Sequence, residues 1–105
     1  MPFNENFLMP RAFLYDDKYS RSLSAGAKLL YSILLDLHIS NQDNSDYIDE
    51  NGDVFIHFEN IAIEEILNVS DKKAIAIKTE LLSQDLLKEI EQCPGEPSRL
   101  YLTIL

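Results

Sequence analysis

Residues 59–84 read ENIAIEEILNVSDKKAIAIKTELLSQ and contain two helical patterns separated by a short turn. Apolar residues at three- and four-residue spacing predict a first helix over 59–67. The turn is formed by Asn68 and Val69, and Ser70 is a residue type that caps the next helix. That second helix is expected to run to about Gln84, and its inward face carries Ala74, Ile77 and Leu81. The opposite face carries Lys72, Ala76, Thr79 and Ser83, with Lys73 and Glu80 at its margins.

The segments on either side of this helix pair complete a mixed α and β pattern. Upstream, Ser24 is a candidate N-cap for a helix that ends near Asn41, and Pro10 is suited to begin a short helical turn through Tyr15. A first hairpin is predicted from strands 47–48 and 54–58, because Asn51-Gly52 between them is a strong turn signal. Downstream, strands over 87–92 and 100–104 flank a loop rich in turn-forming residues. This order predicts an α+β fold, a winged helix-turn-helix with a C-terminal β-hairpin wing.

Length and composition exclude several classes of protein. The chain has 105 residues, of which 46% are hydrophobic and 26% are charged, so we expect one globular domain spanning residues 1–105. No apolar run approaches the roughly 20 residues of a membrane-spanning helix, and no signal peptide is evident. A single cysteine, Cys93, excludes an intramolecular disulfide. We therefore expect a cytoplasmic protein with no membrane partner.

The negative charge of the chain is unevenly distributed. Eighteen acidic side chains against nine basic ones give a net charge of −9. Residues 40–69 hold eight of the acidic side chains and no Lys or Arg, whereas residues 70–105 sum to −1. Since screening limits a charge to about 8–10 Å, the acidity is expected to limit the strength of nucleic-acid binding rather than to forbid it.

Catalytic and metal chemistry have little support in the sequence. His38 falls on an apolar helical stripe, His57 lies in a predicted strand, and neither is close to Cys93 in the chain. Asp49, Asn51 and Asp53 have the spacing of the first ligands of a calcium loop, but Val54 stands where that loop needs glycine. We interpret this stretch as a hairpin turn, and we expect no enzyme activity, no catalytic residues, no metal and no cofactor.

Several motifs resemble the N-terminal domain of plasmid replication initiator A proteins. They include residues 7–13 (FLMPRAF), 27–31 (AKLLY), 49–52 (DENG) and 64–68 (EEILN), and Gly95, Pro97, Leu100 and Tyr101 continue the match. The resemblance implies a winged-helix domain that binds repeated sites in a plasmid origin, usually as a dimer. Most members continue into a C-terminal domain, so residues 1–105 are either a separate protein or the N-terminal part of a longer one. This chain departs from the family in having Ala76 and Thr79 where lysines are usual, and in having an acidic wing.

The predicted double-stranded DNA contacts lie on the helix after Ser70 and on the wing. The helix is expected to face the major groove, and Lys88 and Arg99 are expected to hold phosphates. The DNA-binding residues are thus Ser70, Lys72, Lys73, Ala76, Thr79, Ser83, Lys88 and Arg99. Phe3 and Phe7 are expected at a homodimer interface, because aromatic residues are favoured there. The alternative is a protein-interaction module in which the acidic 43–65 surface meets a basic partner.

Overall fold

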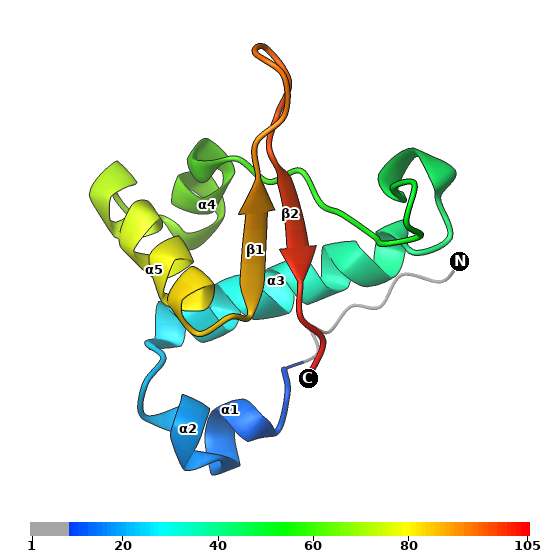
Figure 1. Cartoon of the computed structure of the whole chain (residues 1–105). Helices are drawn as coiled ribbons and strands as arrows, with labels where there is room; N and C mark the ends of the chain where they lie inside the picture. Colours follow the sequence, from blue (N-terminus) through cyan, green and yellow to red (C-terminus); the bar gives the residue numbers. More distant parts are fainter. Residues whose placement is uncertain (1–8) are drawn as a thin grey trace.

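The structure is a computed structural model, and it describes residues 9–105. Its helices are α1 (Ala12–Tyr15), α2 (Asp17–Ser20), α3 (Ala25–Asn41), the 3-10 turn η1 (Ser45–Tyr47), α4 (Asn60–Leu67) and α5 (Asp71–Ser83). Strands β1 (Leu87–Ile90) and β2 (Arg99–Leu102) form an antiparallel hairpin in front of α3, with α4 and α5 beside β1 (Figure 1). Within residues 9–105, none of the helices combines the length and the apolar character needed to cross a membrane.

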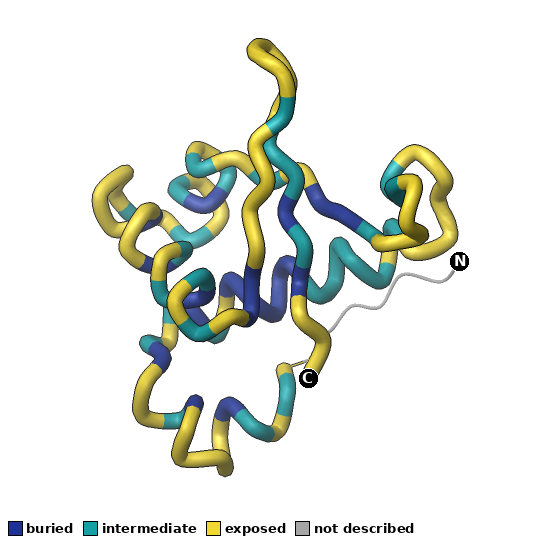
Figure 2. Tube along the Cα trace, in the orientation of Figure 1, coloured by how far each residue is buried: buried dark blue, intermediate teal, exposed yellow. Residues whose placement is uncertain are grey.

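Helix α3 supplies much of the hydrophobic core. Its N-terminus is capped as predicted, because the Ser24 Oγ accepts a hydrogen bond from the Ala27 backbone N–H. Ala27, Leu30 and Tyr31 are fully buried. Figure 2 shows the buried part of this helix where it passes behind the hairpin. The Phe13 ring of α1 packs against the Tyr31 ring at a centroid distance of 4.8 Å, which fastens the N-terminal helices to α3.

The hairpin pairs Leu87 with Leu102 and Ile90 with Arg99. Because successive side chains of a strand alternate between faces, Leu87, Leu100 and Leu102 turn to the core, where each is at most 9% exposed. Directly after β2, the Thr103 backbone oxygen accepts a hydrogen bond from the Tyr31 hydroxyl of α3 at 2.7 Å. The hairpin is therefore seated on α3 along its buried face.

The predicted first hairpin, with strands over 47–48 and 54–58, is wrong in part. Its turn is present, but pairing is limited to one bridge between Ile48 and Val54. Residue Tyr47 ends the 3-10 turn, which begins where the Asn44 side chain accepts from the Asp46 N–H. Ile56 instead forms an antiparallel β-bridge with Leu100, so the chain at this residue lies beside β2.

Candidate nucleic-acid interface

The connection between α4 and α5 has the tight geometry of a helix-turn-helix. Asn68 ends α4 in the left-handed conformation, with φ 53° and ψ 55°, which asparagine tolerates better than most residues. The backbone N–H of Val69 donates to the Glu64 carbonyl at 3.1 Å. Ser70 then caps α5, because its Oγ accepts from the Lys73 N–H at 3.1 Å. Both helix ends are thus satisfied across a turn of three residues.

Helix α5 is fixed on the domain by its apolar face and by one carboxylate. Ala74, Ile77 and Leu81 are at most 1% exposed, as the helical period predicted. The two Glu80 carboxylate oxygens accept from the Ser24 backbone N–H at 2.8 Å and the Ser24 hydroxyl at 2.6 Å. These contacts orient α5 against the N-terminus of α3.

The opposite face of α5 is open to solvent. Lys72, Lys73, Ala76, Thr79 and Ser83 are all exposed, which confirms the predicted division of the helix into two faces. Within residues 9–105, neither of these two lysines has an ion-pair partner. The ammonium groups are therefore available to an anionic ligand.

Three hydroxyls of the predicted site already have partners within α5 or its cap. The Thr79 hydroxyl donates to the Ile75 carbonyl at 2.8 Å, and the Ser83 hydroxyl donates to the Glu80 carbonyl at 2.9 Å. Ser70 is engaged in the cap. These bonds, which have no local signature in the sequence, use the hydroxyl protons of Thr79 and Ser83, so Lys72 and Lys73 are the main free hydrogen-bond donors on the outer face of α5 within the described residues.

The two basic residues of the hairpin lie apart from the exposed stripe of α5. Lys88 lies opposite Tyr101, and Arg99 opposite Ile90, so all four share the sheet face that turns away from the core. The Arg99 guanidinium lies 4.3 Å from the centre of the Phe55 ring, a cation–π contact. Lys88 lines a cavity to which α5 contributes no residue. Their predicted role as phosphate contacts stays a prediction.

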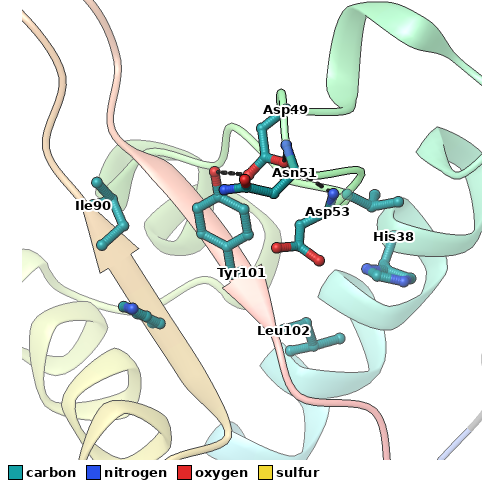
Figure 3. A pocket seen from close by; sticks show the side chains of 9 residues that line it. His38, Asp49, Asn51, Asp53, Ile90, Tyr101 and Leu102 are labelled. Atoms are coloured by element: carbon teal, nitrogen blue, oxygen red, sulfur yellow. Dashed lines mark hydrogen bonds between the residues drawn. The ribbon is translucent and has the colours of Figure 1, made fainter.

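That cavity, of about 400 Å³, lies between the 49–54 loop, the end of α3 and the outer face of the hairpin. Figure 3 shows Tyr101 donating to one Asp49 oxygen, at 2.9 Å. The other oxygen accepts from the N–H groups of Asn51 and Asp53. These bonds, first that from Asp53, hold the pKa of Asp49 below its ordinary value. The Asp49 carboxylate thus closes the turn, which the sequence predicted at 49–53 without indicating this role of Asp49.

A second hollow separates the hairpin loop from α4 and the start of α5. Its lining includes the carboxylates of Glu59, Glu64, Asp71, Glu89 and Glu96. The one lysine among the lining residues, Lys78, is paired with Glu89 at 2.6 Å, and its side chain is only 12% exposed. Sequence reasoning missed this pair, whose members lie on different elements. The negative charge therefore reaches the edge of the predicted DNA-binding surface.

Phe3 and Phe7, which the sequence predicts at a dimer interface, lie outside the described residues. Among residues 9–105, no group of three His, Cys, Asp or Glu side chains is arranged to hold a metal ion. His38, which lines the cavity beside the 49–54 loop, has a buried Nδ1 atom without a hydrogen-bond partner among the described residues. Burial lowers the pKa of this histidine, so its neutral form is favoured.

A helix-turn-helix followed by a seated β-hairpin defines the winged helix-turn-helix class, as the sequence predicted. Three solved structures share this fold across nearly the whole chain. One, described as "N-Terminal domain of DNA binding protein", has a TM-score of 0.77 and 27% identity, covering 99% of this chain and 83% of its own. A second, "Structure of Rep-DNA complex", has a TM-score of 0.76 and 27% identity, covering 99% and 84%. A third, "Structure of MDR initiator", has a TM-score of 0.74 and 33% identity, covering 96% and 78%.

The chain belongs to the family described as "Replication initiator protein A (RepA) N-terminus", whose model matches residues 6–105. The resemblance found in the sequence is therefore confirmed. A search of curated protein sequences found no match to this chain.

Proposed function

We propose that this domain binds double-stranded DNA at repeats of a plasmid origin, as the DNA-reading part of a replication initiator. The observation that carries the proposal is the exposed face of α5, with Lys72 and Lys73 free of ion pairs within the described residues, in a family of replication initiators. A structural neighbour named as a Rep–DNA complex supports the same reading. The protein-interaction module considered as an alternative has no comparable support.

In this arrangement α5 lies in the major groove and the hairpin loop lies against the flanking backbone. Ser70, Lys72, Lys73, Ala76, Thr79 and Ser83 face the duplex, and Lys88 and Arg99 approach phosphates at its edge. The hairpin loop between β1 and β2 is largely exposed and extends away from the helices (Figure 2), as a flanking contact requires. The domain acts by binding alone, without catalysis.

Charge sets the expected strength of this binding. Lysines that neutralise phosphates release counterions, and each contact contributes about 0.9 to the slope of log K against log salt. The net charge of −9 and the carboxylates beside α5 oppose the approach of DNA. We therefore expect weak binding that falls steeply with salt.

The remaining partner assignments are extensions of the same proposal. The domain acts in the cytoplasm as a homodimer, with Phe3 and Phe7 at the interface. The acidic 43–65 surface is available to a basic protein partner at the origin. Light scattering during gel filtration tests the dimer, because a monomer at high concentration would contradict it.

A fluorescence-anisotropy titration tests the proposed function. The probe is a labelled duplex carrying the repeats of the origin that the initiator serves, and the control is a duplex of the same composition in scrambled order. We expect saturable binding at about 50 mM salt and a loss of roughly 10²-fold or more at about 200 mM. An absence of binding at the lower salt concentration would contradict the proposal.

A further inference from the structure

Part of the exposed face of α5 is apolar. Ile75 is 46% exposed although it is a large hydrophobic residue in the middle of the helix. Ala76 beside it is also exposed. Ile75 and Thr79 are four residues apart, so their side chains are neighbours on one face of the helix. Lys72, three residues before Ile75, lies on the same side.

Thr79 contributes a methyl group rather than a hydroxyl to this surface. Its hydroxyl donates to the Ile75 carbonyl one turn earlier, at 2.8 Å. A hydroxyl bonded back to its own helix has used its one proton, which leaves the methyl group on Cβ free to make apolar contacts. The Ser83 hydroxyl is turned back in the same way, to the Glu80 carbonyl. We call the surface formed by Ile75, Ala76 and the Thr79 methyl the apolar strip.

The major groove offers one apolar group to such a surface. Guanine, cytosine and adenine present hydrogen-bond donors and acceptors, whereas thymine adds a C5-methyl group. Because the Thr79 and Ser83 hydroxyl protons are engaged, these two residues cannot donate hydrogen bonds to base acceptors, and the apolar strip can contact a methyl group. Lys72, on the same face, and Lys73, at its margin, supply attraction to phosphates, whereas the strip itself is uncharged.

We propose that α5 recognises its DNA site through thymine C5-methyl groups, which contact Ile75 and the Thr79 methyl. This inference rests on the proposed function, since it requires α5 to enter the major groove. It identifies Ile75 as a specificity-determining residue, and it predicts a site with thymine at the positions facing the centre of α5. The lysines of α5 then contribute affinity that is independent of sequence.

The experiment replaces thymine by deoxyuridine, which differs only in lacking the C5-methyl group. The full chain is first used to select its binding sequence from a randomised duplex library. The selected duplex is then resynthesised with deoxyuridine at one thymine position at a time, and affinities are measured by anisotropy. Each contacted methyl is comparable to one buried methylene, so we expect about a fourfold loss at one to three positions.

The Ile75→Ala variant connects that loss to the strip. In this variant the duplexes with thymine and deoxyuridine should bind equally well at the position that Ile75 contacts. The matched control is Ile104→Ala, which removes a similarly exposed isoleucine, 51% exposed, outside α5. The control should keep the full thymine preference.

Four results would overturn the inference. Equal binding of every deoxyuridine duplex by the unaltered chain would exclude methyl reading while leaving DNA binding intact. A thymine preference that survives in Ile75→Ala would remove the role of Ile75. A change of oligomeric state in Ile75→Ala would show that the strip is a protein contact. If no duplex is enriched, the proposed function itself fails, and the inference fails with it.

Discussion

Replacing Glu80 by alanine removes the carboxylate that fixes α5 on α3. The two oxygens accept from the Ser24 N–H at 2.8 Å and the Ser24 hydroxyl at 2.6 Å. Hydrogen bonds to a charged group contribute about 1.5–3 kcal/mol each. Because both groups are only partly buried, we expect Glu80→Ala to lower the free energy of unfolding by about 2–3 kcal/mol. The melting temperature of a domain of this size should fall by roughly 10–20 °C.

The assay is urea unfolding followed by far-UV circular dichroism. Ser24→Ala and the double variant complete a thermodynamic cycle, in which the coupling between the two residues should be about 1 kcal/mol or more. Glu91→Ala is the matched control, because Glu91 is exposed and its side chain has no hydrogen bond or ion pair within the described residues. A loss below about 0.5 kcal/mol in Glu80→Ala would refute the role of this contact in positioning α5.

Three further predictions concern the stability contributed by Tyr31, by His38 and by the Lys78–Glu89 ion pair. Tyr31→Phe should cost about 1 kcal/mol in urea unfolding at neutral pH, because it removes the hydrogen bonds to the 103–105 backbone. Burial raises the pKa of Tyr31 above 10.0, so stability is complete below that pH and falls above it, and Tyr31→Phe should show a smaller alkaline loss. Burial lowers the pKa of His38 below 6.5, so stability is complete above that pH and should fall as the pH drops toward 5, a dependence that His38→Leu should remove in the same assay. Glu89→Gln should lower the free energy of unfolding by about 1–2 kcal/mol, because it weakens the ion pair of the mostly buried Lys78. The control Glu91→Gln should change it by less than about 0.5 kcal/mol. Equal effects of the two variants would contradict a stabilising role of the Lys78–Glu89 pair.

The faces of α5 were predictable because they depend on local periodicity. Residues 74, 77 and 81 share one side of any helix over this range, and the cap at Ser70 fixes where the helix begins. The order of elements then specified the winged helix. These features depend on residues that are close in sequence.

The 45–58 segment was predicted less well because local side-chain bonds compete there with strand pairing. Asn44 and Asp49 each accept backbone N–H groups within four residues, which favours turns over a ladder. The choice of Leu100 as the partner of Ile56 depends on where β2 is seated on the core. Such a choice has no local signature in the sequence.

The candidate site was predicted in position but not in chemistry. Exposure of Lys72 and Thr79 followed from the helical period, whereas the inward bond of the Thr79 hydroxyl depends on its rotamer. The stacking of Arg99 on Phe55 and the pairing of Lys78 with Glu89 join separate elements. Long-range contacts of this kind decide which charges remain available to DNA.

The salt dependence of duplex binding, compared between variants, tests most directly that α5 is the DNA-contacting element. Removing both of its free lysines, in Lys72→Ala/Lys73→Ala, should weaken binding and reduce the slope of log K against log salt by about 2. Lys18→Ala, at an exposed lysine on α2, should leave the slope nearly unchanged. An unchanged slope in the α5 double variant, or an equal reduction in the Lys18 control, would contradict the account.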